Sequence, residues 1–327
     1  MYKGDDIRKR REDIQNNILK SFGCDIEKAR SGIYMNTPEN RRLGRVGQPY
    51  GKTKGIIIDF NPLKLELKKY KDTLSAQSIF SGVNNKQMLE DIDKVLEFVT
   101  NNKIKINGRF KIEKGTTKTG RVSQKICWQS VRSVGREASA FAGKRRNWAE
   151  NKLQESIIRQ VAEKQGLFIS EKETMRWGKP FDTKGSEAYV YDDPDDDTKV
   201  LKSVYHFVQN PSFLSFVERT IGFNTLFPDT AYDVIGFRQE TEDEDRLGLH
   251  LVLRQPAVHG YILARLPSEN EHQKALQQFE KLGYDVDFNN KTISKNGYVA
   301  SDLSEYNIMK APDGRYHIID AWVRKIS

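Results

Sequence analysis

Three polar residues near the end of the sequence have the types and spacing needed to hold phosphate groups and a metal ion. Asn307 follows Asp302 by five positions, and Asp320 comes directly after an apolar strand expected over 316–319. The Pro-Asp-Gly sequence at 312–314 forms a tight turn, so we expect a hairpin whose second strand ends at Asp320.

This layout is typical of phosphoryl-transfer sites. There a loop acid orients or deprotonates the attacking hydroxyl, while an amide and a second acid hold the metal ions that bridge the phosphates. We therefore expect Asp302 to act on the hydroxyl, and Asn307 and Asp320 to bind Mg²⁺, which takes oxygen ligands. Because Asp and Asn are common turn residues, an ordinary hairpin with a few loop acids is the alternative for either acid alone.

A matching upstream half strengthens the phosphoryl-transfer interpretation. Gly185 and Ser186 lie in a tight turn before the strand 188–191, and an acidic turn leads to the strand 199–204, which carries Lys202. In such an arrangement backbone N–H groups of the turn face the phosphates, and the lysine bonds the α and β phosphates of ATP. The alternative for Lys202 is an edge-strand lysine that faces water.

A helix expected over 211–221 follows this strand, with Phe213, Phe216 and Val217 on its apolar side. If the helix packs beside the strand, Glu218 can pair with Lys202 and fix its ammonium group. An exposed helical glutamate is the other interpretation, and the sequence does not decide between them. Further on, 255–260 reads as a connector between two lobes, with a backbone that could serve an adenine ring.

The first half of the chain differs strongly in charge. Residues 1–150 carry 32 Lys and Arg against 17 Asp and Glu, a net charge of +15, whereas the remaining residues carry 22 against 28, a net charge of −6. We expect a basic N-terminal region over 1–147 and a second domain over 148–327. Binding of nucleic acid by residues 1–150 is suggested by charge alone.

Within the basic region the elements are short. We expect a helix over 5–22, whose basic face is either solvated or in contact with nucleic acid or an acidic partner, and loops over 30–54. A small α+β unit over 55–112 is expected to contain a helix near 88–99 and a hairpin that turns at Asn107-Gly108. Segment 113–147 reads as a linker or an arm.

The remaining features lead us to expect a cytoplasmic protein. The N-terminus has no apolar signal core, and the apolar run at 56–58 is far too short to span a membrane. Cys24 and Cys127 lack metal-ligand spacing, and we expect free thiols in a reducing compartment, with a single disulfide between them as the alternative.

The region from about 150 to 327 resembles the protein-kinase-like domains of polyvalent proteins that phages and mobile elements encode. The residues that carry the resemblance are Gly185 to Tyr191, Lys202, Asn224 to Phe237, Asp302-Leu303, Asn307 and Ile319-Asp320. The resemblance implies a compact two-lobe α+β fold, and ATP and Mg²⁺ as cofactors. It also implies Lys202 as the phosphate lysine with Glu218 as its partner, Asp302 as the base, and Asn307 and Asp320 as metal ligands.

The sequence also departs from ordinary protein kinases. Ala300 and Ser301 stand where many kinases have His-Arg, and Asp320 is followed by Ala321-Trp322 rather than Phe-Gly. From the end of the chain at Ser327 we expect a truncated C-terminal lobe. The expected activity is transfer of the γ-phosphoryl group of ATP to a hydroxyl of a protein or small molecule. The alternative is a catalytically inactive nucleotide-binding or adaptor module with a basic, nucleic-acid-binding N-terminal region.

Overall fold

A computed structural model describes residues 55–81, 84–116, 120–141, 147–181, 188–205, 212–240, 248–266 and 270–326. The chain divides into two compact units, Met1–Ile56 and Ile57–Ser327, and the description below concerns the second. Several sequence predictions lie wholly or partly outside the described residues: the helix 5–22, the loops 30–54, the turn at Gly185 and Ser186, and positions 142–146 of the segment 113–147.

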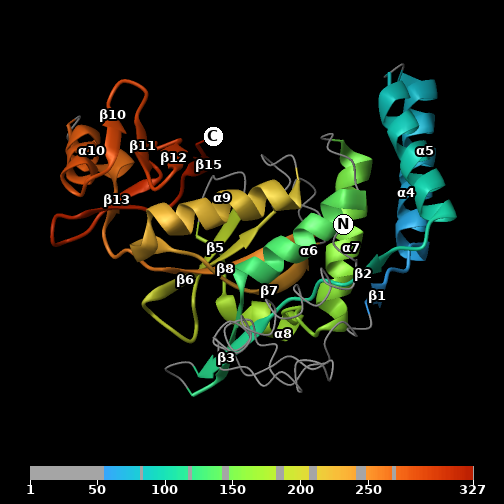
Figure 1. Ribbon diagram of the computed structural model, residues 1–327, viewed down its shortest axis with the longest axis horizontal. Helices are drawn as coiled ribbons and strands as arrows, with labels where there is room; N and C mark the ends of the chain where they lie inside the picture. The colour runs from blue at the N-terminus through green and yellow to red at the C-terminus, as the bar shows by residue number, and fades with distance from the viewer. Residues whose placement is uncertain are drawn as a thin grey trace, which may run out of the picture. The chain divides into compact units, whose positions relative to one another are not determined.

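The largest sheet has six antiparallel strands in the order β3-β4-β7-β8-β6-β5 (Figure 1). Strand β8 lies in its interior and is almost entirely buried, since Leu249, Leu251 and Leu253 contribute to the core. The strands are β3 (Ile112–Thr116), β4 (Val122–Ile126), β5 (Ala188–Asp192), β6 (Lys199–Val204), β7 (Asp233–Glu240) and β8 (Gly248–Pro256).

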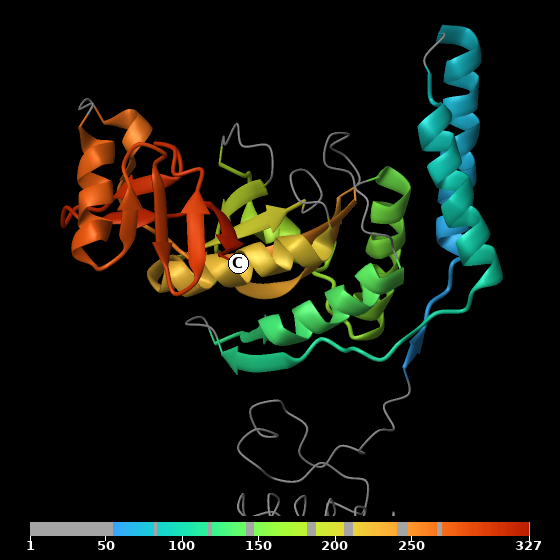
Figure 2. The ribbon, with the colours of Figure 1, turned by 45° about the horizontal axis from the view of Figure 1, so that its top comes forward.

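Helix α9 (Phe213–Leu226) lies along this sheet and packs against α6 (Trp128–Phe141) (Figure 2). The helix begins at a reciprocal cap, in which Ser212 and Ser215 each accept a backbone N–H of the other. Phe213, Phe216 and Phe223 form its buried stripe. The predicted helix is therefore confirmed, although it continues past 221.

A second group of strands packs against the far part of α9, through β12 and β15. Strands β13 and β14 form the hairpin predicted from the Pro-Asp-Gly turn, with Ile308 opposite Ile318. The elements of this group are β9 (Tyr261–Ile262), α10 (Glu271–Lys281), β10 (Asp285–Asp287), β11 (Thr292–Lys295), β12 (Tyr298–Ser301), β13 (Ile308–Lys310), β14 (Tyr316–Ile318) and β15 (Trp322–Lys325).

Helix α7 (Trp148–Lys164) begins at the predicted cap, where the Asn147 side chain accepts the Glu150 N–H at 2.7 Å. Helix α5 (Lys86–Asn101) also has the predicted stripe, including the buried Ile92, Val95 and Val99. The remaining described elements are β1 (Ile56–Ile57), α4 (Asn61–Ser81), β2 (Lys105–Ile106), α8 (Glu171–Thr174), η1 (Met175–Trp177), η2 (Pro228–Thr230) and η4 (Leu263–Arg265). The protein is thus mixed α+β, as predicted.

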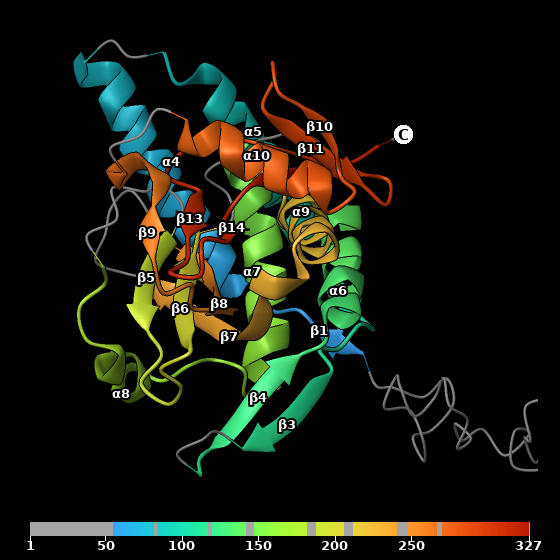
Figure 3. The same ribbon diagram turned by 90° about the vertical axis from the view of Figure 1, so that its left-hand side faces the viewer.

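Two predictions for the N-terminal half are wrong. Asn107-Gly108 does not turn a hairpin, because Glu137 accepts the Asn107 N–H and Gln165 bonds both backbone groups of Phe110. These side chains lie 30 and 55 residues away, so local turn propensity loses to tertiary contacts. Within segment 113–147, the described residues up to 141 form neither a linker nor an arm: β3 and β4 extend the large sheet (Figure 3), and α6 packs on α9.

Candidate active site

The loop after β12 holds the first acid and the amide. Asp302 adopts the left-handed conformation with a φ of 58°, which Asp tolerates better than most residues. The Asn307 side chain donates to the Asp302 carbonyl oxygen at 2.8 Å, and the Asn307 carbonyl accepts the Ile319 N–H at 2.9 Å. The loop is therefore fixed to the strand end that carries Asp320, so the predicted Asp302, Asn307 and Asp320 do lie together.

The electrostatic surroundings of Asp302 differ from those of a surface aspartate. Partial burial raises the pKa of its carboxyl group, and the negative charge of Asp320 raises that pKa further. Arg219 and a hydrogen bond from Asn307 act in the opposite direction without reversing the shift. A carboxylate with a raised pKa is a better proton acceptor than an ordinary aspartate.

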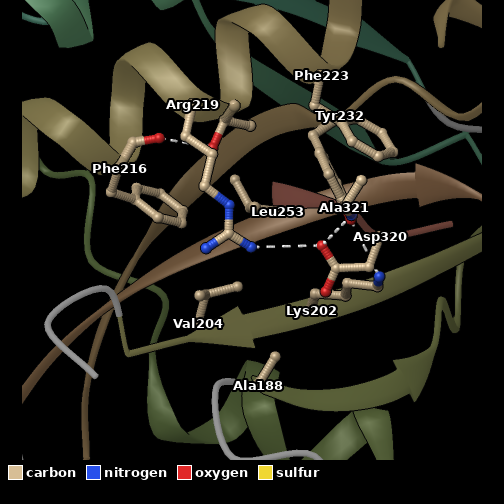
Figure 4. Close-up of a pocket in the computed structure, with 11 residues that line it drawn as sticks. Ala188, Lys202, Val204, Phe216, Arg219, Phe223, Tyr232, Leu253, Asp320 and Ala321 are labelled. Atoms are coloured by element: carbon tan, nitrogen blue, oxygen red, sulfur yellow. Dashed lines mark hydrogen bonds and ion pairs between the residues drawn. The ribbon is translucent and has the colours of Figure 1, made fainter. Parts of the chain in front are cut away.

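Asp320 follows β14 and is held through one carboxylate oxygen. Its Oδ1 accepts the Ala321 N–H at 2.9 Å and lies 3.5 Å from Nη2 of Arg219. The Arg219 guanidinium lies over the ring of Trp322, 4.6 Å from the ring centroid. Figure 4 shows the arginine pointing from α9 to this carboxylate.

Lys202 reaches the same place from β6. Its ammonium group donates to the Tyr232 hydroxyl and to the Ile319 carbonyl oxygen, both at 3.1 Å. Strand β6 lies between β8 and β5, with Lys202 opposite Val190 and Leu253. The alternative of an edge-strand lysine facing water is therefore wrong.

The predicted pairing of Lys202 with Glu218 is also wrong. The Glu218 carboxylate forms ion pairs with Arg132 at 2.5 Å and Arg136 at 3.6 Å, both on α6. The helical spacing explains this, because the residue three positions after Phe216 and four before Phe223 is Arg219, not Glu218. Because the phenylalanine side of α9 is buried, Arg219 points toward the candidate site and Glu218 points toward α6.

The other predicted cofactor-binding residues, Gly185 and Ser186, lie outside the described residues. Several further residues were not identified from the sequence. The Ile319 carbonyl accepts Tyr232 OH at 2.8 Å and Gln255 Nε2 at 3.0 Å in addition to Lys202, and Thr230 Oγ1 donates to the Ile318 carbonyl. Arg219 had a detectable signal in its place in the phenylalanine stripe, and Thr230 and Tyr232 lie in the Asn224–Phe237 stretch that carries the family resemblance.

Of these groups, Lys202, Arg219, Tyr232 and Asp320 line a small open pocket (Figure 4). One cationic side chain from each side, Lys202 and Arg219, faces it together with Asp320. The rest of the lining is mainly apolar: Ala188, Val204, Phe216, Thr220, Phe223, Tyr232, Leu253 and Ala321. A pocket with two cations and one carboxylate suits an anionic ligand.

The oxygen donors fit Mg²⁺ and do not form a complete cage for a metal ion. Among the described residues, no group of three or more His, Cys, Asp and Glu could hold a metal ion. Asp320 Oδ2 and the Asn307 side-chain oxygen are hard donors, and Mg²⁺ is commonly held by one or two carboxylates together with phosphate and water. A metal here would thus depend on a phosphate ligand.

Comparison with known proteins agrees with this chemistry. The family described as "Serine/Threonine/Tyrosine Kinase found in polyvalent proteins" matches residues 151–326, more than half of the chain. No curated protein matches the sequence. In the described segments no helix has the length and apolar character needed to cross a membrane. The chain belongs to the kinase family of polyvalent proteins, and its 151–326 region is a kinase-like domain.

Proposed function

We propose that the protein is an Mg²⁺-dependent phosphotransferase that moves the γ-phosphoryl group of ATP to a hydroxyl of a protein or a small molecule. One observation carries the proposal: Lys202, on β6, and Asp320, after β14, meet through the Ile319 backbone, to which the loop with Asp302 and Asn307 is also bonded. Family membership supports a kinase-like activity in general.

Each residue has a distinct role in the proposal. Lys202 bonds phosphate oxygens, Asn307 and Asp320 offer oxygen ligands to Mg²⁺, and Asp302 accepts the proton of the attacking hydroxyl. Bound Mg²⁺ would neutralise charge on the phosphates and align them. The hydroxyl oxygen forms a bond to the γ-phosphorus while the bond from that phosphorus to the β–γ bridging oxygen breaks, so that ADP leaves.

We expect the connector after β8 to run beside the adenine ring of the nucleotide. The Ala257 N–H is used within the protein, donating to the Thr198 carbonyl at 2.8 Å. Gly260 lies against β13 so closely that a Cβ atom would be 2.1 Å from the Lys310 carbonyl oxygen. This close contact fixes the connector beside the strand that follows the Asp302 loop, and we place the adenine ring along it.

One observation favours the alternative of a catalytically inactive nucleotide-binding module. Lys202 lacks the expected pairing with Glu218, which bonds α6 instead, and Arg219 occupies the side of α9 that faces Asp320. Phosphate binding needs the cations, whereas phosphate transfer also needs Asp302. The two functions therefore separate experimentally at Asp302.

The test compares the full-length wild type with Asp302→Asn. Asparagine keeps the shape and tolerates the left-handed backbone, but it cannot accept the proton. ATP with Mg²⁺ at about 100 times the dissociation constant should stabilise both proteins by about 2.7 kcal/mol, visible as a rise in melting temperature. Transfer of label from γ-labelled ATP should fall about 10²–10⁴-fold in the variant only.

Asp313→Asn is the matched control, because Asp313 is exposed in the β13–β14 turn and pairs with Arg315. It should transfer phosphate like the wild type. If the wild type binds ATP but transfers label neither to itself, nor to proteins of a cell extract, nor to common small acceptors, the protein is a catalytically inactive nucleotide-binding module. Equal rates for wild type and Asp302→Asn would assign the base to another residue.

A further inference from the structure

Helix α9 presents an arginine to the candidate site where an acidic partner of Lys202 was expected. The Arg219 side chain is only 12% exposed, although it carries a full charge. Buried charges in proteins are held by partners, and the partners of this arginine include Asp320 and the ring of Trp322. All three residues lie within the kinase-like region.

The guanidinium group of Arg219 is held in position by Trp322 of β15. Trp322 lies two residues after Asp320, and its ring supports the guanidinium at 4.6 Å. Close approach of α9 to this strand depends on Gly222, where a Cβ atom would lie 2.8 Å from Val323 Cγ1 and 2.9 Å from Tyr298 Cδ1. A planar cation stacked on a ring in this way has little rotational freedom.

The contact with Asp320 uses only one side of the carboxylate. Both Arg219 Nη2 and the Ala321 N–H contact Oδ1, at 3.5 and 2.9 Å. Figure 4 shows the second carboxylate oxygen on the side of Lys202, facing the pocket. The side chain of Asp320 is 42% exposed, so without these two contacts the pocket walls alone would not fix its orientation.

We propose that Arg219 is a positioning residue that orients the Asp320 carboxylate, so that Oδ2 faces the metal ion of the nucleotide complex. The inference rests on the proposed function, because it assigns Asp320 to the metal. In this proposal helix α9 contributes to metal binding through Arg219, whereas one interpretation of the sequence has the helix hold Lys202 through Glu218.

Two physical effects of Arg219 on metal affinity have opposite signs. Its positive charge repels a cation, so removal of the charge alone would tighten metal binding. Its hold on Oδ1 presents Oδ2 in a fixed direction, and loss of such supporting contacts typically weakens metal binding about 10–100-fold. Because Asp320 is partly exposed, water screens the repulsion, and we expect the orienting effect to dominate.

The experiment measures Mn²⁺ binding to the full-length protein with saturating ADP, by the electron paramagnetic resonance signal of free Mn²⁺. Arg219→Met, which keeps the apolar stem, should weaken Mn²⁺ binding about tenfold or more. Arg219→Lys should give a smaller loss, since lysine keeps the charge without the planar stack. Arg159→Met, which removes an arginine paired with Glu163 on α7, should bind Mn²⁺ like the wild type.

Binding of ADP without metal provides the second readout. Because Arg219 is also one of the two cations of the pocket, Arg219→Met should weaken ADP binding, but by a smaller factor than it weakens Mn²⁺ binding. Mn²⁺ affinity that is unchanged or tighter in a folded Arg219→Met protein overturns the inference and leaves the proposed function intact. If Arg219→Met does not fold, unchanged Mn²⁺ affinity in Arg219→Lys overturns it instead. A wild type that binds neither ADP nor Mn²⁺ overturns the proposed function itself.

Discussion

The ammonium group of Lys202 lies 3.1 Å from the backbone carbonyl oxygen of Ile319, although 117 residues separate them in the sequence. The same oxygen accepts hydrogen bonds from Tyr232 OH and Gln255 Nε2. The residue next to Ile319 is Asp320, so the backbone itself sets how far the lysine stands from the carboxylate. In this protein neutral groups contribute to holding the lysine, and an acidic residue of α9 does not.

Tyr232→Phe should therefore loosen Lys202. The change removes the hydroxyl that accepts from Lys202 and donates to Ile319. Gln255 still bonds that carbonyl, so we expect only about 1 kcal/mol lower stability and about fivefold weaker ADP binding. Urea unfolding and ADP titration measure the two effects. Tyr261→Phe, at a residue 67% exposed, is the control; equal behaviour of both variants would contradict a role for the hydroxyl.

Trp128→Phe tests whether segment 113–141 supports the candidate site. The buried Trp128 indole N–H donates to the Tyr232 carbonyl oxygen at 2.8 Å across 104 residues of sequence. Phenylalanine leaves this carbonyl with one donor fewer and a small void, which should cost about 1–3 kcal/mol in unfolding free energy. Trp148→Phe provides the comparison, because that ring stacks on Tyr70 away from the pocket. Similar losses in both proteins would deny Trp128 a special role.

The parts of the site that could be predicted from the sequence are those set by local patterns. A Pro-Asp-Gly turn between short apolar segments determines the β13–β14 hairpin, so the places of Asn307 before it and Asp320 after it follow directly. The apolar neighbours of Lys202 likewise determine strand β6. In each case the chemistry-bearing residue lies within a few positions of the pattern that places it.

The contacts made over long sequence separations could not be predicted. Nothing near Ile319 indicates that its carbonyl accepts three side-chain donors, since this depends on how β6, β7 and β8 pack. The basic segment 113–141 lacks an obvious apolar run, yet Ile126 pairs with Val234 and joins it to the sheet. The charged residues of this segment indicate that it has a solvent-exposed face, but they do not reveal the apolar residues that it buries against the sheet.

The stability of the protein should depend on pH through Glu271. Hydrogen bonds from Lys274, Lys310 and Tyr316 lower the pKa of this carboxyl from its ordinary value of 4.5 to about 2. A carboxylate with a lowered folded-state pKa stabilises the fold above its unfolded pKa and loses that contribution as the pH falls toward the folded one. Glu271→Gln should therefore be less stable than wild type near pH 6, with the difference shrinking between about pH 4.5 and 2.

Urea midpoints of the two proteins across that pH range give the measurement. Glu280→Gln, an exposed glutamate on the same helix, should follow the wild-type curve. Two of the three bonds, those from Lys310 and Tyr316, join α10 to β13 and β14, so the effect should extend to the hairpin that precedes Asp320. A difference between wild type and Glu271→Gln that stays constant down to pH 2.5 would contradict the assigned cause.

Gly222→Ala should displace α9 from β15 and with it the arginine beside Asp320. A new methyl group at 2.8 Å from Val323 and 2.9 Å from Tyr298 is closer than side chains pack, so the helix or the strand must shift. Overpacking of this kind typically costs about 1–3 kcal/mol, partly offset by the better helix propensity of alanine. Arg219 lies one turn earlier on the same helix, so Mn²⁺ binding with ADP should weaken together with stability.

Thr225→Ala, on the exposed side of α9, should change neither by much. Guanidinium unfolding and Mn²⁺ titration of the three proteins decide the matter: a Gly222→Ala protein as stable as wild type, with unchanged Mn²⁺ affinity, would show that the close approach of α9 to β15 does not set the geometry of Asp320.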